Sequence, residues 1–291
     1  MGKRLRGRCL LANVDQAEGL RRMLAGPKPR VFTFLSALKD NEKSEMLVNL
    51  GVSVARQGQQ ILMVDARSSS DSVGAWFNAS IERTLLDVAQ QQRTMHEAVK
   101  VVASGLSVSM LSRQGTLSSS LSAENSRRLS RVFDLAVHRA DMVVVDCDID
   151  ACDAFPLASL DDSEVVIQVS SDPSAIKSAY GLIKRMSARL GRRSFSILVS
   201  GVSEKEAMLI YTNMAQASQR YLAVPLNFIG YVPDDEFVRR AAHQGRSVID
   251  AFPKARSSMA FFQLAERLAV SARSALCLDS VSGQQGIALG I

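Results

Sequence analysis

The sequence predicts an α/β fold, a doubly wound and mostly parallel sheet with helices on both faces. Short aliphatic or β-branched runs alternate with longer segments of helical periodicity, which is the pattern of βαβ units. Residues 142–145 are apolar at every position, as in a parallel strand that is buried on both sides. The predicted strands are residues 30–35, 60–64, 106–111, 141–146, 164–169, 194–199 and 226–230.

The segments between these strands carry helix signals. Within 173–190, Asp172 can cap the helix, Pro173 suits its first position and Gly191 ends it. Residues 44–57 place apolar side chains on one side and stop at a glycine. These signals predict helices that return the chain from one parallel strand to the next.

The ends of the chain lie outside this alternation. Residues 1–29 form a basic arm with one short helical stretch, which Gly-Pro-Lys-Pro at 26–29 separates from the first strand. Residues 30–278 are predicted to form the α/β domain. The Ser, Gly and Gln content of 279–291 predicts a flexible tail.

Composition indicates a soluble globular protein. The chain has 291 residues and is 47% hydrophobic, but no apolar run approaches the ~20 residues that a membrane span needs. The basic N-terminus lacks the apolar segment of a secretory signal, so the protein is expected in the cytoplasm. A net charge of +6 favours acidic partners, which include nucleic acid, anionic membranes and acidic protein surfaces.

Neither the three histidines nor the four cysteines have the spacing of a metal site or a catalytic triad. Cys147 and Cys152 are expected to be buried free thiols. The sequence thus predicts no metal site and no catalytic residue.

The segment 36–44 stands where P-loop nucleotidases hold phosphate, between a strand and a helix that starts with Lys43 and Ser44. A phosphate loop uses glycine because some of its residues need φ > 0 and a close backbone approach. No glycine occurs in this segment, and Asp40 and Glu42 would oppose a triphosphate by about 1 to 4 kcal/mol each. These features argue against a working phosphate loop.

Two aspartates follow predicted strands, at the sheet edge where such folds place magnesium and water ligands. They are Asp65 and Asp146. With Lys43 and Ser44 they form a candidate residual nucleotide site. Two alternatives remain: no nucleotide binds, or Mg-ATP is held in an altered geometry with help from Lys39.

Three further segments carry a family resemblance: D-Q-A-E-G-L-R at 15–21, S-D-P-S-A-I-K-S-A-Y at 171–180 and I-G-Y-V-P-D-D at 229–235. Over roughly residues 12–270 the chain resembles the MinD/ParA group of deviant P-loop ATPases, in particular its flagellar FlhG/FleN (YlxH) branch. The resemblance implies a regulator of flagellar number, placement and assembly.

The departures from the family pattern fall on positions that the family uses for nucleotide. Leu38 aligns with the signature lysine that crosses the ATP-sandwich dimer, Arg67 with the acid that orients water, and Ser200 with the asparagine that reads adenine. The resemblance therefore implies a pseudo-ATPase that is not expected to dimerise across ATP. The alternative is a MinD/ParA-type ATPase with an atypical loop that still binds ATP and cycles on the membrane.

The arm motif implies a partner. In the flagellar branch this helix docks on the GTPase FlhF and stimulates its hydrolysis, which assigns partner contacts to Asp15, Gln16, Leu20 and Arg21. The alternative is an amphipathic helix packed on its own domain. The family also implies a FleQ-like transcriptional regulator or flagellar switch proteins as partners, whereas direct nucleic-acid binding is not expected without a base-reading motif.

The helical pattern at 257–276 places Phe261, Phe262 and Leu268 on one side. In the family a helix near this end binds membrane, and a basic amphipathic helix suits anionic lipid. A helix packed on the sheet has the same pattern, so both interpretations remain. The first would add peripheral contact with the inner membrane or cell pole.

Overall fold

The computed structural model describes residues 29–38, 40–67, 72–77, 83–113 and 121–282. The predicted arm motif, Lys39 and residues 283–291 lie outside this part. At the C-terminal end the side chains are described as far as residue 270.

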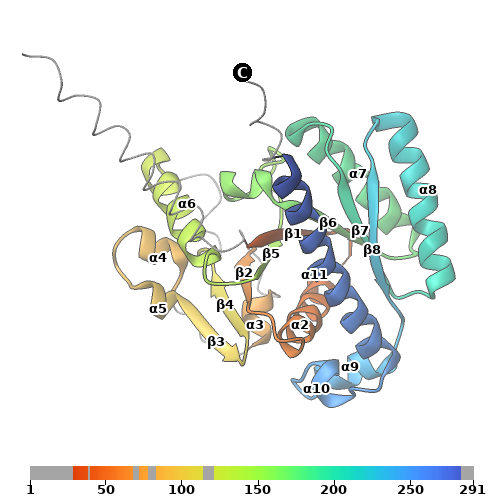
Figure 1. The fold of residues 1–291 in the computed structure, drawn as a ribbon, viewed down its shortest axis with the longest axis horizontal. Coiled ribbons are helices and arrows are strands. Elements are labelled where there is room, and N and C mark those ends of the chain that lie inside the picture. Colours follow the sequence, from red (N-terminus) through yellow and green to blue (C-terminus); the bar gives the residue numbers. More distant parts are fainter. Residues whose placement is uncertain (1–28, 39, 68–71, 78–82, 114–120, 283–291) are drawn as a thin grey trace, which may run out of the picture.

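In the described part of the chain, an eight-stranded sheet has the strand order β3-β4-β2-β5-β1-β6-β7-β8 (Figure 1). All neighbouring strands are parallel except the β3–β4 hairpin. The predicted doubly wound α/β fold is therefore confirmed. The strands are β1 (Arg30–Ser36), β2 (Ile61–Ala66), β3 (Val99–Ala103), β4 (Leu106–Met110), β5 (Met142–Cys147), β6 (Glu164–Val169), β7 (Phe195–Ser200) and β8 (Leu226–Val232).

Helices cover both faces of the sheet (Figure 1). One buried cluster joins the sheet to α4, α6, α7 and α8, and a second joins its other face to α2, α3, α9, α10 and α11. The helices are α2 (Asp40–Arg56), α3 (Val73–Trp76), α4 (Leu85–Ala89), α5 (Met95–Ala98), α6 (Ala123–Val137), α7 (Pro173–Leu190), α8 (Glu204–Leu222), α9 (Glu236–His243), α10 (Val248–Ala251) and α11 (Arg256–Ser282), with a 3-10 turn η1 (Ala158–Asp162).

All the strands predicted from apolar runs are present, with ends shifted by at most two residues. Strands β2 and β5 are buried along their whole length, which explains their continuous apolar sequences. Strand β3 was not predicted. It is a short edge strand, mostly half-exposed or exposed, so its sequence lacks a strong burial pattern.

Helix α7 has the predicted bounds, because its end signals act as expected. The Asp172 carboxylate accepts a hydrogen bond from the Ser174 N–H at 2.8 Å, and Gly191 has φ of 81°. Helix α2 begins at Asp40 instead of the predicted residue 44, so most of the predicted phosphate loop is helical. Helix α11 runs to Ser282, four residues into the predicted tail.

The C-terminal helix α11 packs against the core. Phe261 and Leu268 are 1% and 2% exposed in the cluster that contains α2 and β8, and Phe262 is partly buried there. Arg30 and Gln57 donate hydrogen bonds to the backbone carbonyl oxygens of Leu268 and Phe262 at 2.7 and 2.8 Å. These three side chains contact the protein's own core, which favours packing on the sheet over the membrane interpretation.

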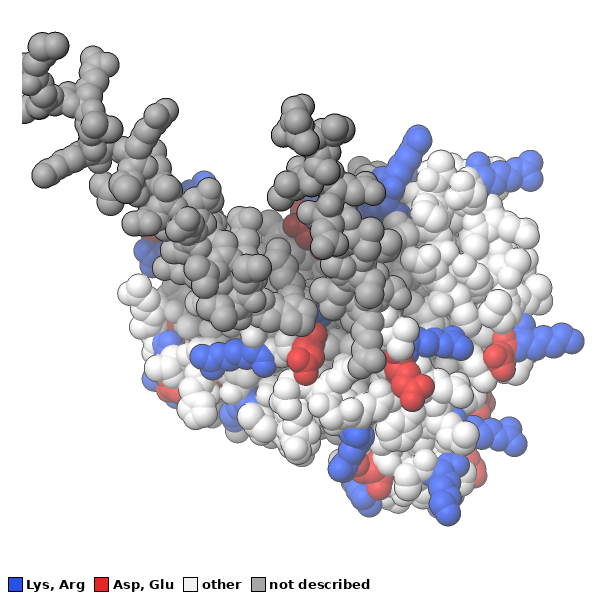
Figure 2. Space-filling model, viewed as in Figure 1, with Lys and Arg blue, Asp and Glu red and all other residues white. Residues whose placement is uncertain are grey.

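No helix in the part of the chain that the structure describes is long and apolar enough to span a bilayer. Figure 2 shows basic and acidic side chains interspersed over the described residues of one face. On that face the net positive charge does not gather into one continuous patch.

The two central cysteines differ. Cys147 is buried at the end of β5, as predicted, whereas Cys152 is exposed. The prediction for Cys152 is wrong because this residue lies in a surface turn, where its N–H donates to the Asp150 carboxylate at 2.8 Å.

Candidate functional site

The carboxyl edge of the sheet brings the predicted nucleotide residues together. Asp65 at the end of β2 and Asp146 at the end of β5 are register partners on adjacent strands. Lys43 and Ser44 lie near the start of α2, which follows β1 on the other side of β5, and both side chains are buried. These residues lie close together because the carboxyl ends of parallel strands share one edge of the sheet.

Lys43 is turned inward onto the protein itself. Its side chain is 1% exposed, and its Nζ lies 2.8 Å from Asp146 Oδ1 and 3.5 Å from Asp148 Oδ1. The same Nζ donates a hydrogen bond to the backbone carbonyl oxygen of Cys147 at 2.6 Å. The ammonium group is therefore already neutralised and hydrogen-bonded by the end of β5.

Arg67 supplies a second buried cation. Its Nε lies 3.2 Å from Asp148 Oδ2 and 3.8 Å from Asp146 Oδ1, and its side chain is 1% exposed. We call Lys43, Arg67, Asp146 and Asp148 the ionic cluster. Two cations face two carboxylates, so the cluster is formally neutral without a bound anion.

Asp146 depends on these cations. Its side chain is 1% exposed, and neither carboxylate oxygen accepts an aligned hydrogen bond from a described group. The short contact between Lys43 Nζ and Asp146 is thus an ion pair, and the aligned hydrogen bond from Nζ goes to the backbone carbonyl oxygen of Cys147. A buried carboxylate without such pairing would cost several kcal/mol, so Lys43 and Arg67 make the charge tolerable at this position.

Asp65 holds the backbone that follows β2. Its two carboxylate oxygens accept hydrogen bonds from the N–H groups of Arg67 and Gly74 at 3.1 and 3.3 Å. Burial raises the pKa of Asp65 above its ordinary value of 3.8; a hydrogen bond with Ser72 opposes the rise, and the charge of Asp146 adds to it. A Cβ atom at residue 74 would lie 2.8 Å from this carboxylate, so the contact requires glycine there.

The connection between β1 and α2 does not fit a phosphate loop. It is only three residues long, 37–39, because β1 ends at Ser36 and α2 begins at Asp40. The Ala37 N–H donates to the Gln168 carbonyl oxygen at 3.1 Å, and the Leu38 N–H donates to Ser36 Oγ at 3.0 Å. Among the described residues of this segment none has positive φ. The N–H groups of Ala37 and Leu38 are therefore used within the chain.

The described residues do not fit a magnesium site either. Asp65 is committed to backbone N–H groups and Asp146 to the ionic cluster. Over the described ranges, no three His, Cys, Asp or Glu side chains are grouped so that they could hold a metal ion. Both carboxylates are therefore engaged within the protein itself.

The other departures from the family pattern also have internal roles. Leu38 packs against the core cluster on one face of the sheet, and Ser200 Oγ accepts a hydrogen bond from Gln168 Nε2 at 3.0 Å. The roles of Arg67 and Asp148 were missed by sequence reasoning. The available signal is a pair of alternating acids, 146 and 148, directly after the apolar run 142–145, together with an arginine two residues after Asp65.

Comparisons with known proteins support the resemblance. No protein-family model matches the chain. The antiactivator FleN of Pseudomonas aeruginosa is 27% identical over 228 residues, which cover 78% of this chain and 81% of FleN. The MinD cell division protein of Aquifex aeolicus superposes with a TM-score of 0.59 at 18% identity, over 82% of this chain and 96% of that one.

A second solved structure, MinD of Pyrococcus horikoshii complexed with Mg-ADP, has a TM-score of 0.60 at 17% identity and covers 82% of this chain and 96% of its own. At such identities the structural likeness shows the fold alone. Together with the similarity to FleN, it confirms the resemblance to the MinD/ParA group and its FlhG/FleN branch.

Replacing Lys43 should destabilise the fold. Lys43→Met leaves Asp146 buried with Arg67 as its remaining cation, so the free energy of unfolding should fall by about 3 kcal/mol, the lower end of the range for breaking a buried pair. Urea denaturation followed by circular dichroism measures this change. Lys205→Met, at an exposed residue of α8, is the matched control. A Lys43 variant as stable as the control would show that the pair is not needed.

Asp65 should make stability depend on pH. Because burial raises its folded-state pKa above 3.8, folding favours the protonated form. That stabilisation is complete below pH 3.8 and is lost as the pH rises through the folded-state pKa. The unfolding free energy of the wild type, relative to that of Asp65→Asn, should therefore fall over this window. Urea titrations at a series of pH values test this; parallel curves would contradict it.

Proposed function

We propose that this chain, which has the fold of the MinD/ParA ATPases and resembles their FlhG/FleN branch, regulates flagellar number, placement or assembly through protein contacts, without a nucleotide cycle. The observation that carries the proposal is the buried position of Lys43 in the ionic cluster. The lysine that a P-loop offers to phosphate is here part of the folded core.

Energetics support a pseudo-ATPase. To reach a phosphate, Lys43 would have to move away from Asp146 and from the Cys147 carbonyl oxygen. The buried carboxylate of Asp146 would then keep only Arg67 as its cation. Breaking such a pair costs about 3 to 5 kcal/mol. Since about 1.4 kcal/mol is a tenfold change in affinity, a micromolar site would become a site of roughly 0.1 to several millimolar.

The arm supports a GTPase partner. The motif at 15–21 lies outside the described residues, so this part of the proposal rests on sequence. Gln16 would be a polar side chain delivered in trans to an FlhF-like GTPase, where it helps to fix the attacking water or a developing charge. Leu20 and Arg21, one turn later on the predicted helix, would anchor it.

The similarity to FleN supports a second role. FleN is described as an antiactivator, and we extend that activity to this chain as restraint of a FleQ-like transcriptional regulator. The role requires protein contact only, so it is compatible with a closed nucleotide site. Contact with the inner membrane or the cell pole would need surfaces other than Phe261 and Leu268, which are buried.

The alternative of an ATPase that cycles on the membrane keeps one supporting observation. Lys43, Asp65 and Asp146 still meet at the carboxyl edge of the sheet, where relatives with this fold place nucleotide ligands. Nucleotide binding separates the two functions.

Mg-ATP should not stabilise the protein. At ~0.1 mM Mg-ATP, which is 100 times the Kd of a micromolar site, binding would raise the free energy of unfolding by ~2.7 kcal/mol. Because Lys43 is held in the ionic cluster, we expect a rise of less than ~0.5 kcal/mol in thermal unfolding at this concentration. Isothermal calorimetry checks the same point. An Mg-ATP shift that disappears in the least destabilising Lys43 variant would establish binding at this site and contradict the pseudo-ATPase proposal.

The arm should stimulate an FlhF-like GTPase. A peptide of residues 1–26 is expected to raise GTP turnover, and Gln16→Ala should remove the effect because the polar group is lost. Phosphate release measures turnover. Glu18→Ala, at an unspecified position of the motif, is the matched control and should retain stimulation. Equal activity of both variant peptides, or none from the parent peptide, would refute the assignment.

A further inference from the structure

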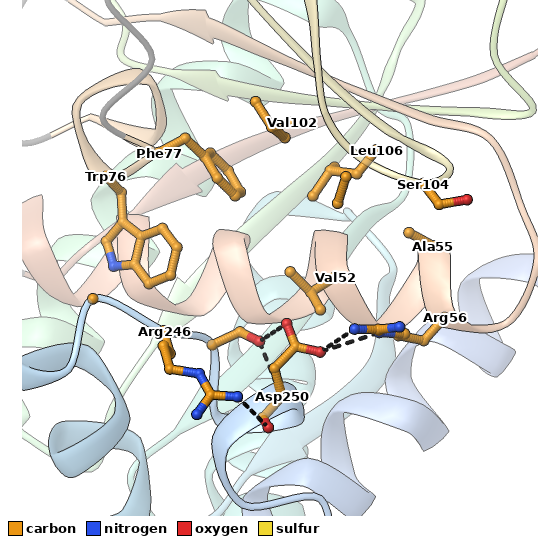
Figure 3. Close-up of a pocket in the computed structure, with 13 residues that line it drawn as sticks. Val52, Ala55, Arg56, Trp76, Phe77, Val102, Ser104, Leu106, Arg246 and Asp250 are labelled. Carbon is orange, nitrogen blue, oxygen red and sulfur yellow. Dashed lines mark hydrogen bonds and ion pairs between the residues drawn. The ribbon is translucent and has the colours of Figure 1, made fainter.

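A cleft opens beside the edge strand β3 (Figure 3). Its volume is about 260 Å³. The apolar wall comes from Val52 and Ala55 of α2, Trp76 and Phe77 at the end of α3, and Val102 and Leu106 of the β3–β4 hairpin. The two aromatic rings meet edge to face with centroids 5.2 Å apart. One side of the cleft is therefore an aromatic surface.

The rim of the cleft is basic. Arg56 donates hydrogen bonds to Asp250 Oδ1 through Nε and Nη2, and Arg246 donates from Nη2 to the Asp250 backbone carbonyl oxygen at 2.9 Å (Figure 3). Only Arg56 pairs with the Asp250 carboxylate, whereas Arg246 binds a backbone oxygen, so two guanidinium groups and one carboxylate give the rim a net positive charge. The Arg56 side chain is 62% exposed, so it can reach a further anion.

Strand β3 adds a backbone surface to this cleft. Within the described chain it is the last strand of the sheet and pairs only with β4. An edge strand presents N–H and C=O groups that an added strand can pair. Val101 on β3 is 76% exposed, and its neighbours Val102 and Ala103 line the cleft. An extended chain laid along β3 would place alternate side chains over the cleft.

We propose that the β3 edge and this cleft form a docking site for an extended, acidic segment of a partner protein. The segment adds a strand to β3, inserts one large apolar side chain against Trp76 and places a carboxylate on Arg56 and Arg246. The cleft is smaller than the ~300 to 1,000 Å³ of sites for whole small molecules, which suits a single side chain. The net charge of the rim selects an acidic segment.

The edge also limits its occupants. The register of β3 and β4 shifts between Val101 and Ala103, and such bulges restrict indiscriminate strand pairing. Backbone pairing over a few residues gives modest affinity, so the cleft and its charges determine which segment binds. This site uses neither the arm nor the ionic cluster, so its failure would leave the proposed function untouched.

Trp76 is the only tryptophan of the chain and reports on the cleft directly. The probes are short fluorescein-labelled peptides of alternating threonine and valine, with a central leucine or phenylalanine followed by aspartate. With the full-length protein we expect saturable anisotropy, a shift of Trp76 emission on binding of the unlabelled peptides, and slower hydrogen exchange in residues 99–103. A peptide with proline at the centre should not bind, because proline cannot complete the ladder.

Two variants test the cleft. Ala55→Leu fills it and should weaken binding at least tenfold, whereas Ala188→Leu, at an exposed helical residue of α7, should not. Arg246→Gln should weaken binding of the aspartate peptide but not of the same peptide with asparagine in place of aspartate. This second variant still tests the cleft if Ala55→Leu folds poorly. Absence of saturable binding, equal binding of the proline peptide, or binding unaffected by both variants would overturn the proposal. Dimers in sedimentation, together with slow hydrogen exchange of residues 99–103 in those dimers, would assign the edge to a second copy of the chain. This result would also overturn the proposal.

Discussion

The buried pair of Lys43 and Asp146 is the constraint on which the rest of the candidate site depends. Two charges that are each 1% exposed are tolerated only together, and the hydrogen bond from Lys43 to the Cys147 carbonyl oxygen fixes the lysine on the end of β5. The pair joins the first turn of α2 to the central strand β5, and α2 begins at Asp40, three residues before Lys43. An early helix start leaves three residues for the connection from β1, too few for a loop around phosphate.

In the proposed function the nucleotide-binding scaffold is kept without nucleotide, and the same edge supports that proposal. Arg67 and Asp148 complete a neutral cluster, so the positive charge that a P-loop directs at phosphate is balanced by the chain itself. Asp65 binds backbone N–H groups in place of a metal. In this arrangement the carboxyl edge stabilises the fold, and we propose that contacts with other proteins use surfaces elsewhere, among them the predicted arm and the β3 edge.

Much of the fold could be predicted from the sequence, because buried parallel strands and capped helices leave local signals. The apolar run 142–145 and the Asp172–Pro173 start of α7 are examples. Strand β3 could not, since its edge position leaves no burial pattern. Of the ionic cluster, Lys43 and Asp146 were named from the sequence, whereas the roles of Arg67 and Asp148 and the arrangement of the cluster were not. Partner choice between Lys43 and the acids after β5 depends on contacts across about a hundred residues, which local patterns do not report.

The most direct test of the closed site observes the Lys43 ammonium group itself. In protein labelled with ¹⁵N-lysine, a buried, paired ammonium should give a slowly exchanging NMR signal, assigned by its loss in a Lys43 variant. The ionic cluster predicts that this signal is present without ligand and does not move when Mg-ATP or Mg-ADP is added. A Lys43 signal that exchanges freely with water, or that shifts saturably with nucleotide, would contradict it.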